Sequence, residues 1–309
     1  MKIAIAGTGD LSHYFYEELP LHGHETITLT RFPKTFLSAL CIEQRVTDYT
    51  VPDLVKNLAD CDAVISTIAA PGPEHATVHL ALLEACKLSP KCKKMIPSEF
   101  AGNVEEDLLR DEPVFMAAGR GAVREALRAQ REVKWTLVVN GWFAEYLVSA
   151  GQRYFADLGG AAWPMDYGNK MFTMYGDGEK PVTLTSARDV ARAMARLVEL
   201  DADDWEEYTH LAGETVTWAG LYEMLKGRGG EWEVVKKSYE DAVEEVEEAE
   251  MVGGVARINA QLQLMGYTEI NRANPDKAKR HKDLYFHGLN FRGIEEIMGE
   301  AELRPDAVI

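Results

Sequence analysis

A glycine-rich turn near the beginning of the chain has the spacing of a pyrophosphate-binding loop. It reads Gly-Thr-Gly-Asp-Leu-Ser over residues 7–12, directly after the apolar run Lys2–Ala6 and before an amphipathic segment. Between a buried strand and a helix, Gly7 allows a tight turn, and Gly9 lets the backbone approach a phosphate at the helix N-terminus. The pattern predicts a dinucleotide site formed by Gly7, Thr8, Gly9, Asp10, Leu11 and Ser12.

Two basic residues occur where the second strand of such a unit ends. The expected strand Thr26–Thr30 is followed by Arg31 and Lys34, with no acidic residue between them. NAD-binding units usually carry Asp or Glu here, which binds the ribose hydroxyls. A guanidinium instead matches a 2′-phosphate in charge and in geometry. We therefore predict that the dinucleotide is NADP(H) and that Arg31 and Lys34 bind its 2′-phosphate.

A parallel sheet is needed to position the glycine turn and the two basic residues. The first half of the chain has the sequence pattern of such a sheet. Short apolar runs alternate with amphipathic segments, which is typical of βαβ units covered by helices on both faces. The expected strands are Lys2–Ala6, Thr26–Thr30, Leu40–Val46, Ala63–Ile68, Lys94–Ile96 and Trp135–Val139, and the expected helices are Leu11–Leu19, Pro52–Leu58, His75–Cys86 and Val114–Gln130. The fold class predicted is α/β, with a Rossmann-type doubly wound parallel sheet.

The pattern changes after about residue 140, where aromatic residues and glycine pairs become frequent. We expect a helix over Val190–Leu200 with Asp189 near its N-terminus, a strand over Tyr208–Ala212 that returns to the main sheet, and an acidic, solvated helix over Tyr239–Glu250. Residues 1–145 are predicted to form the NADP(H)-binding domain, with later returns from about 176–212. Residues 146–309 are predicted to form a smaller, mostly helical substrate-binding part.

Composition narrows the possible partners. The chain has 309 residues and a net charge of −17, which disfavours nucleic acid and membrane surfaces. No apolar run approaches the roughly 20 residues of a membrane span. The four cysteines form no Cys-x-x-Cys pair, so we expect buried thiols in a reducing, cytoplasmic compartment: Cys41, Cys61, Cys86 and Cys92. A monomer or homodimer is expected.

Three further segments resemble a known family. Together with the glycine turn, the segments Asp62–Thr67, Met95–Gly102 and Asn140–Phe143 resemble the NmrA-like, isoflavone reductase-like group of atypical short-chain dehydrogenases. The tetrad Pro-Ser-Glu-Phe at residues 97–100 is the most specific part, and the resemblance covers about the first 200 residues. It implies a Rossmann fold, NADP(H) and hydride chemistry on aromatic or alkenyl metabolites.

The resemblance also implies roles for individual residues. Asp48 and Tyr49 would line the adenine, and residues 66–68 would pass beneath the ribose and nicotinamide. The cofactor-binding residues implied in this way are Asp48, Tyr49, Ser66, Thr67, Ile68, Pro97, Ser98, Phe100 and Asn140. The residues expected to bind a hydrophobic small-molecule substrate are Trp142, Phe143 and Tyr146.

The sequence departs from the family at the residue that usually transfers a proton. The resemblance implies a lysine there as general acid or base, but alignment on Val123–Leu127 places Arg120 at that position. Arginine does not release its proton at neutral pH, although it can polarise a carbonyl as a fixed cation. Arg120 is therefore the candidate catalytic residue.

Three functions remain open, the second of them because of Arg120. The first is an NADP(H)-dependent oxidoreductase acting on an aromatic or polycyclic secondary metabolite. The second is an isomerase or cyclase that uses bound NADP(H) transiently or as a scaffold. The third is a non-enzymatic, NADP(H)-sensing regulator. The aromatic residues after position 140 favour a pocket over a flat interaction surface, and thus an enzyme.

Two histidines share one face of an expected helix. His75 and His79 are four residues apart, so their side chains are neighbours. A metal would need further ligands, and no histidine in the chain has the spacing of a common metal motif. We predict no metal site, with one of these histidines at the surface and the other toward the cofactor.

Overall fold

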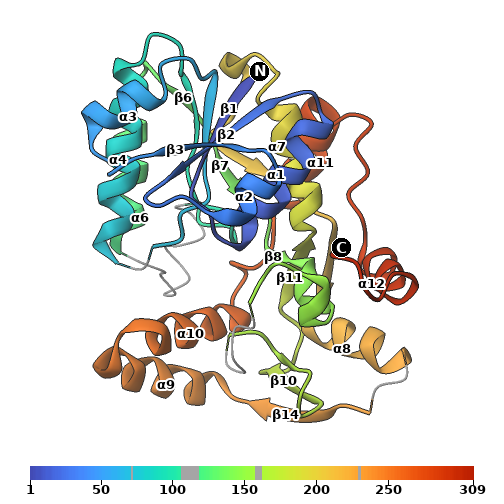
Figure 1. Ribbon diagram of the computed structural model, residues 1–309. Helices are drawn as coiled ribbons and strands as arrows, with labels where there is room; N and C mark the ends of the chain where they lie inside the picture. The colour runs from blue at the N-terminus through green and yellow to red at the C-terminus, as the bar shows by residue number, and fades with distance from the viewer. Residues whose placement is uncertain (71, 106–117, 157–161, 229–230) are drawn as a thin grey trace.

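A six-stranded, fully parallel sheet carries the first half of the protein (Figure 1). The computed structural model describes residues 1–309 except 71, 106–117, 157–161 and 229–230. The strand order is β3-β2-β1-β4-β5-β6, which is the Rossmann order, and it reverses between β1 and β4. The strands are β1 (Lys2–Ala6), β2 (Glu25–Thr30), β3 (Glu43–Val46), β4 (Ala63–Ser66), β5 (Lys94–Ile96) and β6 (Lys134–Trp135).

Helices cover both faces of this sheet. On one face α1 (Asp10–Leu21) packs against α7 (Ala187–Leu197), and on the other α4 (Pro73–Leu88) lies between α3 (Val51–Asn57) and α6 (Ala118–Arg128). Successive strand side chains point to opposite faces, so β1 contributes Ile3 and Ile5 to one core and Ala4 and Ala6 to the other. The short α2 (Thr35–Ala39) precedes β3. The doubly wound α/β fold is thereby confirmed.

The second half adds two small sheets and further helices, and Figure 1 shows α8, α9, α10, β10 and β14 below the main sheet. One sheet contains β8 (Trp142–Phe143), β11 (Pro181–Thr185) and β13 (Glu214–Thr217), and the other contains β9 (Met165–Asp166), β10 (Met171–Tyr175) and β14 (Glu233–Lys237). The helices are α8 (Trp218–Gly227), α9 (Tyr239–Val252), α10 (Gly254–Leu264), α11 (Pro275–Tyr285) and α12 (Ile294–Leu303). Among the described residues, no helix has the length and apolarity required to cross a membrane.

The predicted strand Trp135–Val139 is interrupted at its second residue. The Thr136 hydroxyl lies 2.8 Å from that of Thr209, and β7 (Leu137–Val139) pairs in parallel with β12 (Tyr208–His210) while β6 pairs with β5. The predicted return of the chain over Tyr208–Ala212 therefore pairs with β7, one residue beyond the edge strand β6, in a two-stranded sheet that is separate from the main one.

Three other expectations change in detail. The strand expected from Leu40 begins only at Glu43, because Cys41 has a positive φ of 56°. Cys41 is also exposed, so the expectation of a buried thiol is wrong for this cysteine and holds for the other three. The first four residues of the helix expected over Val114–Gln130 lie outside the described part of the chain, and α6 is described from Ala118.

Candidate active site

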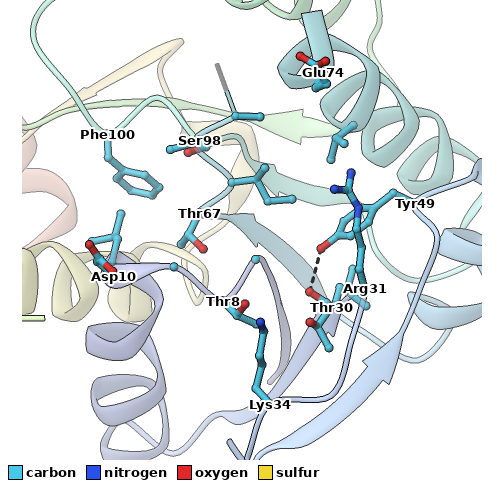
Figure 2. A pocket seen from close by; sticks show the side chains of 18 of the residues that line it. Thr8, Asp10, Thr30, Arg31, Lys34, Tyr49, Thr67, Glu74, Ser98 and Phe100 are labelled. Atoms are coloured by element: carbon cyan, nitrogen blue, oxygen red, sulfur yellow. Dashed lines mark hydrogen bonds between the residues drawn. The ribbon is translucent and has the colours of Figure 1, made fainter. Parts of the chain in front are cut away.

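A cleft of about 940 Å³ opens at the carboxyl ends of β1, β2, β4 and β5. Open α/β sheets bind their ligands at this edge, where the strand order reverses. The structure places fifteen of the predicted site residues on its wall: Gly7, Thr8, Gly9, Asp10, Leu11, Arg31, Lys34, Tyr49, Thr67, Ile68, Ser98, Phe100, Arg120, Phe143 and Tyr146. Figure 2 shows the glycine turn with Arg31 and Tyr49 on one side and Phe100 on the other.

The first glycine of the turn is required by both conformation and space. Gly7 has φ of +112°, and a Cβ atom there would lie 2.9 Å from the Thr67 hydroxyl oxygen. Its carbonyl accepts a hydrogen bond of 2.9 Å from the Tyr16 hydroxyl. Gly9 has extended backbone and open space around it, and no side chain caps the helix that begins after it. The uncapped first turn of α1 thus leaves backbone N–H groups available to an anion.

Asp10 and Ser12 make protein contacts that keep the turn compatible with a phosphate. The Asp10 carboxylate accepts a hydrogen bond of 3.1 Å from the backbone N–H of Ala156, far along the chain. Ser12 is buried, its hydroxyl donates to the Gly9 carbonyl, and it does not line the cleft. Ser12 therefore supports the turn from behind.

The second strand ends in a basic, aromatic corner. Arg31 and Lys34 are both exposed on the cleft wall, and neither has an ion-pair partner among the described residues. The Arg31 guanidinium carbon lies 5.7 Å from the centre of the Tyr49 ring. The Tyr49 hydroxyl donates to the Leu29 carbonyl at 2.8 Å, the contact dashed in Figure 2. This corner offers two cations beside a fixed aromatic ring.

Asp48, predicted to line the adenine, does not reach the cleft. It is exposed, and its carboxylate accepts a hydrogen bond of 2.8 Å from the backbone N–H of Thr50, which lowers the pKa of Asp48. Three other predicted residues are buried behind the wall, namely Ser66, Pro97 and Asn140. The Asn140 side chain donates to the Gly141 carbonyl, and its own oxygen has no partner among the described residues.

The middle of the cleft is formed by Thr67, Ile68 and Ser98, at the ends of β4 and β5. Behind it His75 and His79 stack with ring centres 3.9 Å apart, and both are buried. His79 accepts a hydrogen bond from the Ser98 N–H at 3.3 Å, so it holds the cleft wall by its side chain. The expectation that one of these histidines is at the surface is wrong, because both lie on the buried face of α4, which packs between α3 and α6.

A buried charge cluster lies next to these histidines. Arg120 lines the cleft from α6, and its guanidinium nitrogen is 3.9 Å from a carboxylate oxygen of Glu99. The same oxygen accepts a hydrogen bond of 2.8 Å from Arg124, one turn further along α6. Burial lowers the pKa of the Arg120 guanidinium, while Glu99 opposes that shift. Arg120 remains a cation and cannot act as the proton donor that a lysine would be.

Aromatic side chains form the other end of the cleft. Phe143 and Phe155 stack with ring centres 4.8 Å apart, and Tyr146 stacks on Phe155 at 5.3 Å. Trp142 faces away from the cleft, since its indole N–H donates to Asn271 at 3.1 Å and its ring packs among other aromatics. Phe143 and Tyr146 thus line the cleft, and Trp142 is part of the core.

Sequence reasoning missed several lining residues. Phe155 was one of a run of aromatics that are buried in most folds, and only its packing on Phe143 shows that it faces the cleft. Phe32 lines the basic corner although it is 72% exposed, and its position directly after Arg31 could have indicated this. Glu74 and Val78 enter from α4, whose orientation the sequence did not reveal. Among the described residues, no group of three or more metal-binding side chains occurs.

The amino-acid sequence is similar to those of several oxidoreductases and reductases. The chain is 36% identical over 310 residues to "Oxidoreductase swnR" of Arthroderma benhamiae, with all of both chains covered. It is 24% identical to "Isoflavone reductase homolog P3" of Arabidopsis thaliana over 64% of each chain. The protein belongs to the NmrA-like, isoflavone reductase-like family. Its relatives are named oxidoreductases and reductases, so this member of an oxidoreductase family is an enzyme rather than a non-enzymatic regulator.

Solved structures of the family share the fold. The leucoanthocyanidin reductase of Vitis vinifera, solved as a binary complex with NADPH, matches with a TM-score of 0.70 at 20% identity, over 98% of this chain and 100% of the other. No general protein-family model matches the chain. The residues of the cleft fit the same cofactor in this family member. An uncapped helix start suits a pyrophosphate, and two cations without an ion-pair partner in the described part of the chain suit a 2′-phosphate.

Proposed function

We propose that the protein is an NADP(H)-dependent reductase that acts on a hydrophobic small molecule with an aromatic or polycyclic skeleton. The observation that carries the proposal is the composition of one continuous cleft. Its basic corner contains Arg31 and Lys34 in a protein of net charge −17, and its other end is walled by Phe143, Tyr146 and Phe155. A phosphate-bearing cofactor would bind at the basic end of the cleft, and an apolar substrate would bind at the aromatic end.

Each part of the cleft has a task in binding. The first turn of α1 would receive the pyrophosphate, and Arg31 with Lys34 would bind the 2′-phosphate. NADPH supplies a hydride when it is bound in such a site. Thr67, Ile68 and Ser98 would form the surface on which the nicotinamide lies, because they are at the centre of the cleft between its charged and aromatic ends.

The residue at the reacting end differs from the family's usual proton donor. Arg120 can hold an oxygen of the substrate and stabilise negative charge that develops there, without giving up its own proton. This same property supports the second candidate, an isomerase or cyclase that leaves the oxidation state of the substrate unchanged. The two candidates differ in whether the cofactor is consumed.

The test measures the binding of the dinucleotide and the oxidation of NADPH separately. Fluorescence titration with NADPH and NADH should show tighter binding of NADPH. Incubation with a panel of enones and alkenyl phenols, with and without a carboxyl group, should oxidise NADPH in proportion to the product formed. Product formation at constant NADPH would favour the isomerase or cyclase. Failure to bind either dinucleotide would contradict the whole proposal.

A further inference from the structure

The charge cluster behind the cleft contains one carboxylate for two guanidinium groups. Glu99, Arg120 and Arg124 have side chains that are 1%, 16% and 7% exposed. Glu99 and Arg124 are the charged groups that act on Arg120 among the described residues. Burial keeps the neighbouring histidines neutral, since it lowers the pKa of His75 to about 3 and of His79 to about 4. The cluster therefore carries one excess positive charge.

That excess charge is located on Arg120. Arg124 donates to Glu99 at 2.8 Å, whereas Arg120 is 3.9 Å from the same oxygen and has no hydrogen bond to a described residue. The second oxygen of Glu99 is buried and has no partner among the described residues, so Arg120 does not turn toward it. Instead the Arg120 side chain lines the cleft. A mostly buried guanidinium whose N–H donors have no acceptor destabilises the folded protein, unless a bound anion accepts those hydrogen bonds.

We propose that Arg120 binds a carboxylate of the substrate, so that the enzyme takes a hydrophobic carboxylic acid rather than a neutral molecule. The inference rests on the proposed function, because it concerns the substrate end of the same cleft. A carboxylate matches the two parallel N–H groups of a guanidinium. Phe100 and Phe143, on the same cleft wall, would contact the apolar part of such a molecule.

Arg124 acts as a positioning residue in this arrangement. It forms the hydrogen-bonded ion pair with one oxygen of Glu99, and Arg120 faces the cleft instead. Without Arg124, Glu99 would attract Arg120 across a short distance in a buried setting, and the excess charge would vanish. Loss of Arg124 should therefore weaken carboxylate binding although Arg124 does not line the cleft.

The test compares a carboxylate with its neutral amide. Cinnamate and cinnamamide have nearly the same shape, and isothermal titration of the protein saturated with NADP+ should show cinnamate binding about tenfold tighter or more, as expected for a charge-assisted pair. Arg120→Met and Arg124→Met should both remove most of this preference. Arg120→Lys keeps the positive charge and should retain part of the preference for cinnamate. This variant can replace Arg120→Met in the test if the methionine variant does not fold.

The matched control is Arg128→Met. Arg128 lies one turn after Arg124 on the same helix and pairs with Glu207, so this variant should keep the full preference. Equal affinity of the wild type for cinnamate and cinnamamide, or failure of both to bind, would overturn the inference. The inference would also be overturned if Arg120→Met kept the preference for cinnamate but lost much of its affinity for NADP+. Arg120 would then bind the cofactor rather than the substrate.

Titration with NADP+ alone separates the two proposals. If the wild type binds NADP+ but shows no carboxylate preference, only the present inference fails. If it does not bind NADP+, the proposed function fails, and the comparison of cinnamate with cinnamamide can still be made without the cofactor.

Discussion

Arg31 and Lys34 are exposed at the end of β2, which is where proteins that bind NAD and those that bind NADP differ. The Arg31 guanidinium already lies over the Tyr49 ring, and Tyr49 is held by its hydrogen bond to Leu29. Arg31 is therefore partly ordered before a ligand binds, and less rotamer entropy would be lost on binding. We therefore expect Arg31, together with Lys34, to favour NADPH over NADH.

Arg31→Ala should weaken NADPH binding about tenfold to a hundredfold, because a charge-assisted hydrogen bond is lost. NADH has no 2′-phosphate, so its affinity should hardly change. Fluorescence titration with both dinucleotides measures this. Arg196→Ala removes the same charge from an exposed position on α7 and is the control. Equal weakening of NADPH and NADH by Arg31→Ala would contradict the 2′-phosphate assignment.

At the scale of elements, the start of α7 joins the two halves of the protein. Ser186 caps this helix by accepting from the Asp189 N–H, and its hydroxyl donates to Glu145 at 2.6 Å. Arg292, just before α12, also contacts Ser186. Glu145 immediately precedes Tyr146, which lines the cleft. The cap thus anchors the segment that carries the aromatic end of the site.

Ser186→Ala should lower the free energy of unfolding by about 2–3 kcal/mol, because it removes a helix cap and leaves buried partners unsatisfied. Ser238→Ala provides a comparison, since Ser238 caps the exposed helix α9 with no such partners and should cost about 1 kcal/mol. Urea unfolding of both variants measures the difference. Similar losses in the two variants would show that the buried network around Ser186 adds nothing to the cap.

At the scale of the whole molecule, several buried histidines make the fold sensitive to acid. Burial lowers the pKa of His75 to about 3 and the pKa values of His79 and His210 to about 4, from an ordinary value of 6.5. Above pH 6.5 these groups are neutral in both the folded and the unfolded chain. Below it the unfolded chain takes up protons first, so stability falls as the pH drops from about 6.5 toward 4.

We expect the free energy of unfolding to fall between pH 6.5 and pH 4 by an amount on the order of 2 kcal/mol per buried histidine. His75→Leu should reduce this fall, because the substitution removes a buried titratable group whose two ring nitrogens have no hydrogen-bond partner among the described residues. Urea unfolding at a series of pH values provides the measurement. A variant whose pH dependence runs parallel to that of the wild type would contradict the role of His75.

The sequence by itself determined the parts of this protein whose physics is local. The glycine turn, the basic residues after Thr30 and the apolar strands depend on spacing within a few residues, and the structure places Gly7, Gly9 and Arg31 in one cleft as expected. The identity of Arg120 was also visible, including its inability to donate a proton.

Only the tertiary structure decided what lies beside these residues. Three contacts depend on residues far apart in the chain. Asp10 binds the backbone of Ala156, Arg120 and Arg124 share Glu99, and Phe155 lies on the wall of the cleft. Trp142 looked as suited to the cleft as Phe143 until its hydrogen bond to Asn271 was known. Burial and partner choice arise from packing between elements, which no local pattern encodes, and they give Arg120 its excess charge.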